Sequence, residues 1–302
     1  MWLARTNRSA TGVQISGRTV RVVELERRRR GVVVRGMAED ELEHSVDPFM
    51  LGRGEGSDEL FECLQALVEQ AEMGMRRVCV SVDRRAVLLK QRPRIRAGAR
   101  GRRALRADRR HLLWEASAFL GEEVPRYSVD CAVQERSGFI VAVRTQVLDG
   151  YAALFARLGI SDVDFDVEPF ALHNAAEAAG VLSGKGTRIL LGLEDQGACL
   201  LRVEDGEVAD VRLTAAPAQS IAPVERAMMC LAAAGAADGA VGIWVAAPGA
   251  EEVSAELSRR LDVACEPLSL MLAVASDAEP MPPAEEAPFA VAAGLALRRL
   301  SA

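Results

Sequence analysis

The sequence lacks any long uninterrupted run of hydrophobic residues. Hydrophobic residues make up 50% of the 302 positions, but charged residues or proline break every apolar stretch well before the length of a bilayer-spanning helix. Residues 1–8, Met-Trp-Leu-Ala-Arg-Thr-Asn-Arg, also lack the continuous apolar core of a secretory signal peptide. The sequence therefore predicts a soluble, cytoplasmic protein.

Cysteine and histidine are too few and too scattered to form a recognisable metal site. The three histidines, His44, His111 and His173, lie far apart, and none is near a cysteine at the spacing of metal ligands. The cysteines form no Cys-x-x-Cys pair and lie mostly in apolar stretches, so we expect buried, reduced thiols and neither a metal site nor a catalytic triad. The six cysteines are Cys63, Cys79, Cys131, Cys199, Cys230 and Cys265.

Aromatic residues make up only 4% of the chain, and the formal net charge is −6. A protein that binds nucleic acid over much of its surface would carry the opposite charge, and single strands are bound by aromatic side chains that stack on the bases. The composition therefore argues against nucleic acid as a partner. Trp114 and Trp244 lie in apolar settings and are expected in the core.

The hydrophobic patterning divides the chain into two halves that follow one plan. Each half opens with three short strands separated by turns, and helices and further strands follow. A duplication at a scale of ~150 residues is too long for a solenoid and suits two related α/β lobes that face each other across a cleft. The expected elements of the first half are a hairpin over 12–25, a strand at 31–35, a loop over 38–57, a helix over 58–73 with Ser57 as N-cap, and a strand at 78–82.

The middle of the chain predicts a small α+β insert, and the second half then restarts the pattern. The insert would contain a helix over 111–120, strands near 127–134 and 139–144, and a helix over 147–158. The second half would contain strands at 162–166, 187–193, 199–204, 207–213 and 239–246, helices at 169–179, 221–233, 251–261 and 289–300, and a loop over 276–287. We therefore expect a first lobe at 1–83, completed by a C-terminal helix at 288–302, an insert at 84–160, and a second lobe at 161–287.

Four segments resemble the actin-like ATPase superfamily, and in particular its PilM-type assembly proteins of type IV pili and the related cytoplasmic domain of the type II secretion L protein. "GVQISGRTVRVVEL" is similar to the first phosphate loop, and "EASAFLGEEVPRYSVDCAVQ" is similar to the inserted subdomain. "VDFDVEPFALHNAAE" resembles the connecting segment, and "PFAVAAGLALRRL" resembles the closing helix. The resemblance implies an α/β, actin-like (ribonuclease H-like) fold with duplicated lobes and a small inserted α+β subdomain.

The resemblance also implies a function. Such a protein would be a cytoplasmic scaffold, peripheral at the inner membrane. It would bind the cytoplasmic tail of a membrane-anchored pilus or secretion protein in a groove on the inserted subdomain. Homo-oligomers are compatible with the superfamily, because some members polymerise and others pair. The tail would lie around the strand at 139–144 and the helix at 111–120, where an exposed edge strand would accept it by strand addition. Its contact residues would be Phe139, Val141, Val143 and Arg144.

The phosphate loops depart from the superfamily pattern. Gln14 and Ser16 stand where the first loop carries an aspartate and a glycine, and an amide cannot offset Mg²⁺ as a carboxylate does. In the second loop Gly192 and Glu194 replace the aspartate and the glycine, and Glu194 would repel phosphate. The sequence thus predicts a vestigial nucleotide cleft without catalytic residues, ATP or magnesium; its residues would be Gln14, Ser16, Gly17, Arg18, Thr19, Glu168, Gly192, Glu194, Asp195 and Gly249.

Two alternatives stay open at this point. A shift of one residue would let Asp195 and Gly197 form the second loop, and an active ATPase or kinase would then use Glu168 and Asp195. The basic segment 84–110 holds twelve arginines and lysines and a single acid, Asp108. It is either a solvated surface or a contact with anionic lipid or an acidic partner, with Arg92, Arg94, Arg96, Arg102 and Arg103 as its patch.

Overall fold

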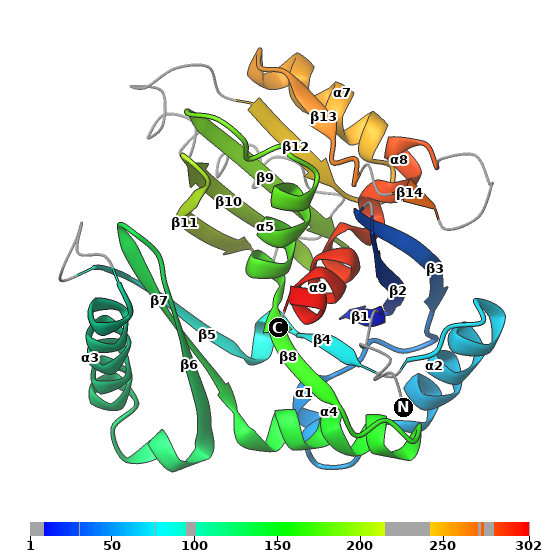
Figure 1. The fold of residues 1–302 in the computed structure, drawn as a ribbon. Coiled ribbons are helices and arrows are strands. Elements are labelled where there is room, and N and C mark those ends of the chain that lie inside the picture. The colour runs from blue at the N-terminus through cyan, green and yellow to red at the C-terminus, as the bar shows by residue number, and fades with distance from the viewer. Residues whose placement is uncertain are drawn as a thin grey trace, which may run out of the picture.

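The computed structural model describes residues 9–29, 31–75, 77–94, 101–214, 242–270, 273–274 and 281–301. Three β-sheets organise this part of the chain, two large and one small (Figure 1). The expected helix at 221–233 lies outside the described residues, and the expected strand at 239–246 is described from Gly242 onward.

The first sheet contains an antiparallel meander followed by parallel strands. Its order is β14-β3-β2-β1-β4-β8, in which β4 pairs parallel to β1 and β8 pairs parallel to β4. The hairpin predicted at 12–25 is confirmed, and its register places Gln14 opposite Arg21. The strands are β1 (Ser9–Ser16), β2 (Thr19–Arg28), β3 (Gly31–Glu41), β4 (Val78–Val82), β8 (Val163–Val167) and β14 (Ala273–Val274).

The second sheet repeats this plan. Its order is β11-β10-β9-β12-β13, with the meander antiparallel and β12 and β13 parallel to β9. The meander, the fourth strand and the fifth strand therefore have the same arrangement in both sheets, and the duplication predicted from the sequence is confirmed. The strands are β9 (Thr187–Glu194), β10 (Gly197–Glu204), β11 (Glu207–Thr214), β12 (Gly242–Ala246) and β13 (Cys265–Pro267).

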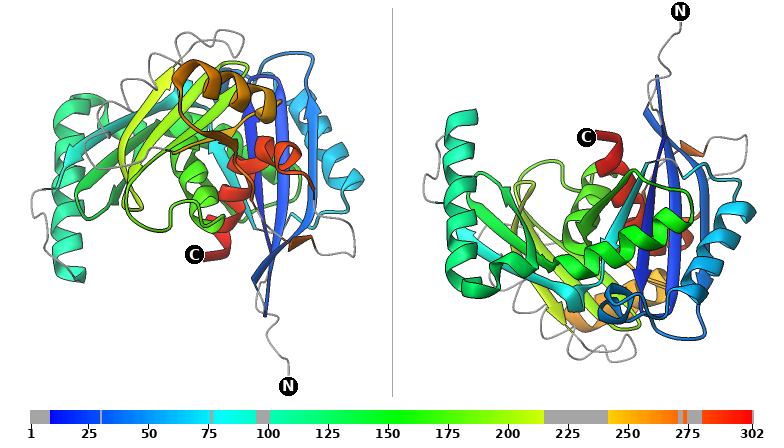
Figure 2. Two further views of the ribbon diagram at one scale, coloured as in Figure 1. Left: turned by 90° about the horizontal axis from the view of Figure 1, so that it is seen from above. Right: turned by 90° about the horizontal axis from the view of Figure 1, so that it is seen from below.

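Two helices, α5 (Glu168–Ala178) and α9 (Ala290–Ser301), pack between the two large sheets and against each other (Figures 1 and 2). Their approach is close because glycines remove side chains at the contacts. A Cβ on Gly294 would lie 1.8 Å from the Ala171 carbonyl oxygen, and one on Gly12 would lie 1.8 Å from the Ala292 carbonyl oxygen. The buried core between the sheets thus depends on backbone-to-backbone packing.

Further helices cover the outer faces of the large sheets. On the first sheet, α2 (Asp58–Gln70) and α4 (Thr145–Arg157) bury apolar residues such as Leu64 and Leu154. On the second sheet, α7 (Ala250–Leu261) buries Leu257. Amphipathic helices that place one apolar face on a sheet produce this layered arrangement. The shorter helices are α1 (Pro48–Gly52), α8 (Pro283–Glu286), and the 3₁₀ turns η1 (Arg84–Ala86), η2 (Gly121–Arg126) and η4 (Ala287–Phe289).

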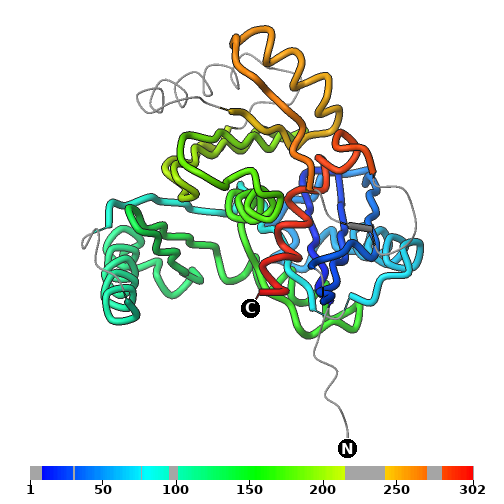
Figure 3. The backbone as a smooth tube through the Cα atoms, turned by 45° about the horizontal axis from the view of Figure 1, so that its top comes forward, coloured from blue at the N-terminus to red at the C-terminus, as the bar shows by residue number. Residues whose placement is uncertain are grey.

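The third sheet lies to the side of the two large sheets and carries α3 (Arg102–Leu120) on one face (Figure 3). Its order is β5-β7-β6, and both pairings are antiparallel. Leu112 and Ala116 of α3 pack on Cys131 and Ile140 of the sheet. The three strands are β5 (Val87–Pro93), β6 (Tyr127–Val133) and β7 (Ser137–Arg144).

Several predicted boundaries are wrong. Residues 38–41 continue β3, and the expected loop over 38–57 also contains α1. The arginine-rich segment contains β5, and α3 begins nine residues before the predicted start at His111. In β5 the polar composition argues against a strand, but the backbone pairing with β7 outweighs it. The boundaries at 83 and 160 stay predictions, although β8 of the expected second lobe pairs within the first sheet.

Candidate functional site

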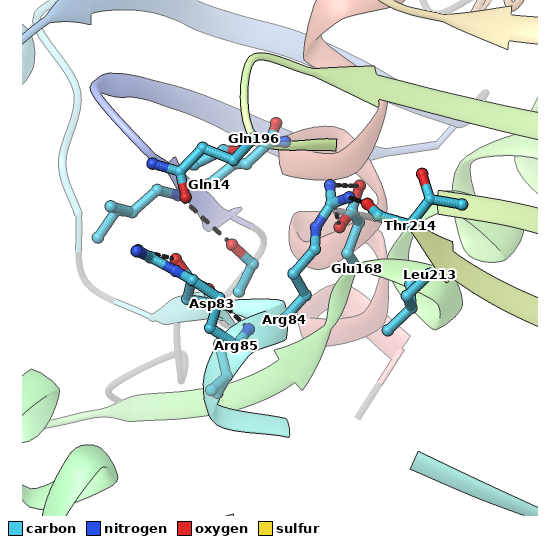
Figure 4. A pocket seen from close by; sticks show the side chains of 12 residues that line it. Gln14, Asp83, Arg84, Arg85, Glu168, Gln196, Leu213 and Thr214 are labelled. Atoms are coloured by element: carbon cyan, nitrogen blue, oxygen red, sulfur yellow. Dashed lines mark hydrogen bonds and ion pairs between the residues drawn. The ribbon is translucent and has the colours of Figure 1, made fainter. Parts of the chain in front are cut away.

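A cleft lies where the carboxyl ends of the parallel strands β1, β4 and β8 meet the second sheet. This is the edge at which open α/β sheets hold their ligands. The cavity there measures about 250 Å³, which is below the range of about 300–1,000 Å³ that is usual for ligand pockets. Figure 4 shows its lining, which is formed by Gln14, Ile15, Ser16, Ser81, Val82, Asp83, Arg84, Arg85, Glu168, Gln196, Leu213 and Thr214.

The two hairpin turns that would hold phosphate meet each other directly. Gly17 occupies the β1–β2 turn with φ of +63°, and a Cβ at this position would lie 2.8 Å from Nε2 of Gln196 in the β9–β10 turn. Gln196 Nε2 also donates to Ser45 Oγ. The space beside the Gly17 backbone, which a phosphate would need, is therefore occupied by the Gln196 side chain of the opposite turn.

A buried ion pair bridges the two large sheets beside this contact. Arg21 Nη1 of β2 lies 2.7 Å from Glu194 Oε1 of β9, and the two side chains are only 2% and 5% exposed. Gln14 Nε2 donates to the same carboxylate oxygen at 2.9 Å, and Arg21 also pairs with Glu39. Burial alone would lower the pKa of Arg21, but Glu194 and Glu39 raise it, so this guanidinium stays charged. Glu194 is thus bound to an arginine of the chain itself.

A second ion pair closes the other side of the cavity (Figure 4). Arg84 is the first residue of η1, which follows β4. Its Nη2 lies 2.9 Å from Glu168 Oε2, and its Nη1 donates to the Thr214 carbonyl oxygen at 3.4 Å. Burial raises the pKa of Glu168 to about 7, against the opposing effect of Arg84. Arg84 thereby joins the start of α5 to the last residue of β11.

The residues of this cleft do not fit a nucleotide with its metal ion. The lining carboxylates Asp83 and Glu168 are paired with Arg85 and Arg84, so neither is free to bind Mg²⁺, which prefers carboxylate and water oxygens. The two arginines are likewise engaged: Arg84 would have to leave a largely buried ion pair to bind phosphate, and Arg85 a half-exposed one. Gln14, at the position of the metal-organising acid, uses its amide nitrogen for Glu194.

The structure brings some of the predicted cleft residues together and separates others. Gln14, Ser16 and Glu168 line the cavity, whereas Gly17 and Glu194 lie in the contacts described above, and a Cβ on Gly192 would lie 3.2 Å from Glu168 Oε1. The remaining four do not line the cavity: Arg18 pairs with Glu41, Thr19 lies opposite Glu41 of β3, Asp195 is exposed in its turn, and Gly249 precedes α7.

The sequence interpretation missed Arg21 and Arg84 as cleft residues. A signal for Arg21 was present, because a hairpin with its turn at 16–19 places residue 21 opposite residue 14, and a lone arginine between Val20 and Val22 requires a buried partner. Arg84 directly follows a buried strand, which is a usual place for functional side chains. Neither pattern identifies Glu194 or Glu168 as the partner, because both contacts join segments far apart in the chain.

A groove lies between the third sheet and the first sheet. Its volume is about 490 Å³, and it is bordered by β6 and β8, which are edge strands of their sheets. Three aspartates and one arginine lie among its lining residues, and each aspartate pairs with an arginine: Asp130 with Arg109, Asp164 with Arg299 and Asp166 with Arg298. The four charged lining residues are Asp130, Asp164, Asp166 and Arg298.

The prediction of an edge strand at 139–144 is wrong. β7 is the central strand of its sheet and pairs with β5 and β6 on its two sides, so its backbone is not open to strand addition. Val141 and Val143 nevertheless line the groove. Phe139 is buried against Phe170, with 5.4 Å between ring centroids, and Arg144 lies over the Tyr127 ring. The edge strands of the third sheet are β5 and β6, and those that border the groove are β6 and β8.

The predicted basic patch separates into two groups. Arg94 forms a buried pair with Asp108, at 2.6 Å and with the side chains 4% and 5% exposed, and Arg92 pairs with Glu115. These two arginines hold β5 against α3 and are not free for an external partner. Arg102 and Arg103 are exposed on α3, and Arg96 lies outside the described residues.

Other features of the described ranges concern metals, thiols and membranes. Among these residues no cluster of three or more histidine, cysteine or acidic side chains is arranged to hold a metal ion. Burial raises the pKa of Cys79 to about 12.

None of the helices that the structure describes has both the length and the apolar character needed to span a bilayer. Trp114, expected in the core, is instead 65% exposed.

The duplicated sheets, the two helices between them and the cleft at the strand ends define an actin-like ATPase fold, as the sequence resemblance predicted. A solved PilM–PilN type IV pilus biogenesis complex contains a chain of this fold, with a TM-score of 0.69 and 18% identity over 96% of this chain and 98% of that one. A Bacteroides thetaiotaomicron protein with an actin-like ATPase fold and unknown function has a TM-score of 0.50 and 8% identity, over 88% and 93% of the two chains.

A third solved structure is the cytoplasmic domain of EpsL, an inner-membrane component of the Vibrio cholerae type II secretion system. It covers 96% of this chain and 94% of its own at 11% identity, but its TM-score of 0.48 is too low to support an argument. No protein-family model matches the chain, and no curated protein matches it. At these identities the likeness shows the fold.

Proposed function

We propose that this chain is a cytoplasmic scaffold, peripheral at the inner membrane, of a type IV pilus or type II secretion platform. It would bind the cytoplasmic tail of a membrane protein in the groove between β6 and β8 and would act without ATP hydrolysis. The observation that carries the proposal is the likeness over 96% of the chain to a structure solved as a PilM–PilN complex of pilus biogenesis. The exposed aspartates of the groove, Asp130 and Asp164, support the binding of a basic tail, and the internally paired cleft supports the absence of ATP hydrolysis.

The chemistry of the groove suits a tail of this kind. The cytoplasmic segments next to membrane spans are enriched in lysine and arginine. Asp130 and Asp164, whose side chains are 62% and 45% exposed, would exchange their arginine partners for the cations of such a tail. An extended tail can also add its backbone to the free edge of β6 or β8. Side chains of the tail would then pack on Val141 and Val143.

We expect the protein to bind neither ATP nor ADP in the presence of magnesium. Phosphate would have to displace Glu168 from Arg84 and Gln196 from the Gly17 turn, and each displacement exposes a buried polar group. Calorimetric titration with millimolar nucleotide should give no binding heat, and the melting temperature should not change. An actin-fold protein that binds nucleotide serves as the positive control.

The opposite result would reinstate the enzymatic alternative. Micromolar Mg-ATP binding that Glu168→Gln abolishes would mean that the ion pair opens for nucleotide, and an ATPase or kinase that uses Glu168 and Asp195 would become the better proposal. Binding that tolerates Glu168→Gln would place the nucleotide elsewhere on the protein. Either form of binding contradicts a nucleotide-independent scaffold.

The groove is tested by photo-crosslinking and then by charge reversal. A photoreactive residue at Ser128, which is exposed and lines the groove, should crosslink in cells to the cytoplasmic tail of one inner-membrane protein. A synthetic peptide of that tail should bind, and Asp130→Lys should weaken it about tenfold, which corresponds to ~1.4 kcal/mol. The ion pair of Asp130 is with the exposed Arg109, and both side chains are more than half exposed, so the fold should tolerate the change.

Glu122→Lys is the matched control. Glu122 is an exposed acid in the turn η2 that leads into β6, and it does not line the groove. The control makes the same change of charge and should leave the peptide affinity unchanged. Equal effects of the two variants would indicate a general charge effect, and a crosslink at Glu122 without one at Ser128 would place the tail outside the groove.

A further inference from the structure

The helix α3 presents two faces with different chemistry. Ala104, Asp108, Leu112 and Ala116 recur every four residues and face the third sheet. A second set at helical spacing, Arg103, Arg106, Arg110 and Trp114, lies on the opposite side and is exposed. We call this set the outer face of α3. The helix stands at the margin of the molecule in every view, so no other described element covers this face (Figures 1–3).

The arginines of the outer face differ from those of the inner side in having no acidic partner. Arg92, Arg94 and Arg109 each pair with a carboxylate. Within residues 101–214 and the other described ranges, no ion pair involves Arg102, Arg103, Arg106 or Arg110. Three arginines therefore pair with acids between the third sheet and α3, and four exposed cations of α3 are in none of these pairs.

The indole of Trp114 is held at the surface next to these cations. Its ring is 65% exposed and stacks on His111, with 5.7 Å between the ring centroids. His111 is itself held by Glu115, which also binds Arg92 of β5. An exposed tryptophan fixed by a chain of contacts to the sheet is unusual for a surface without a partner, because burial of a large aromatic side chain is favourable.

We infer that the outer face of α3 docks directly on an anionic lipid surface. Arginines close to such a surface bind its headgroups, and tryptophan prefers the interface between headgroups and acyl chains. Nucleic acid fits less well, because a single indole offers only one stacking position for the bases. The inference goes beyond the proposed function, since it requires neither a protein tail in the groove nor nucleotide.

Vesicle co-sedimentation tests this inference with the full chain alone. The protein should bind phosphatidylcholine vesicles that contain phosphatidylglycerol, should not bind vesicles of pure phosphatidylcholine, and should dissociate as salt is added. Each arginine removed should weaken binding roughly fivefold. The triple variant Arg103→Gln/Arg106→Gln/Arg110→Gln should therefore bind on the order of 100-fold more weakly.

The control variant Arg126→Gln/Arg212→Gln/Arg259→Gln removes the same charge from exposed positions elsewhere. It should bind as the unaltered protein does, and both variants should melt at similar temperatures. With Trp2 and Trp244 replaced by phenylalanine, emission from Trp114 should shift to shorter wavelength on anionic vesicles. Equal loss in both triple variants, or an unshifted Trp114, would overturn the inference. So would binding to single-stranded DNA through the same arginines without binding to vesicles.

Discussion

Replacement of Arg21 by methionine should destabilise the protein by about 3–5 kcal/mol, because it leaves Glu194 buried without its cation. The two side chains are 2% and 5% exposed and join the first sheet to the second. Glu39, the other partner, is 44% exposed and can be solvated by water. Urea unfolding followed by tryptophan fluorescence would measure the loss.

The double variant Arg21→Met/Glu194→Gln separates the buried charge from lost packing. The glutamine keeps an oxygen for Gln14 Nε2 and removes the charge that Arg21 neutralised, so most of the lost stability should return. Arg126→Met removes a pair whose side chains are 69% and 49% exposed, and it should change stability by under about 1 kcal/mol. Additive losses in the double variant would mean that the two residues are not coupled.

Gly294→Ala should also destabilise the protein, by roughly 3 kcal/mol. Helix propensity alone predicts the opposite sign, since alanine stabilises a helix interior by about 1 kcal/mol relative to glycine. The new Cβ would lie 1.8 Å from the Ala171 carbonyl oxygen and would force α5 and α9 apart. The same unfolding experiment measures this change, and its sign decides between packing and propensity.

Gly74→Ala is the matched control for this change. A Cβ on Gly74 would have one atom within 4 Å, Glu24 Oε1 at 3.6 Å, and the residue has no left-handed backbone. Its replacement should be neutral or stabilise the protein by about 0.4–1 kcal/mol through the unfolded chain. A stabilised Gly294→Ala variant would show that the two helices do not need the glycine for their approach.

The elements that the sequence predicted well are those with strong local patterns. The hairpin that begins the first half alternates between apolar and polar residues and carries Gly17 in its turn, and the one that begins the second half is a pair of short, strongly apolar strands. Repetition of the same plan in the second half was enough to predict the two large sheets. The closing helix was found because its apolar residues recur at helical spacing. The role of Gly294 is seen only in the structure, where it allows the close contact with α5.

The elements that the sequence predicted poorly depend on partners far away in the chain. The strand β5 is rich in arginine and lysine and was not recognised, because its pairing with β7 and the contacts of Arg92 and Arg94 with α3 stabilise it. The position of β7 at the centre of its sheet follows from the same pairing. Trp114 was expected in the core because tryptophan is usually buried, and only the orientation of α3 shows that it is exposed.

The sequence by itself determined that the chain has two similar α/β halves, that its phosphate loops lack the usual acid and glycines, and that its basic residues cluster in one segment. These are local properties, since a turn, a strand or a charge run is decided by neighbouring residues. Only the tertiary structure decided that Arg21 binds Glu194, that Arg84 binds Glu168, and which arginines remain exposed on α3. The physical reason is that a buried charge requires a partner, and packing of distant segments alone selects which partner lies within reach.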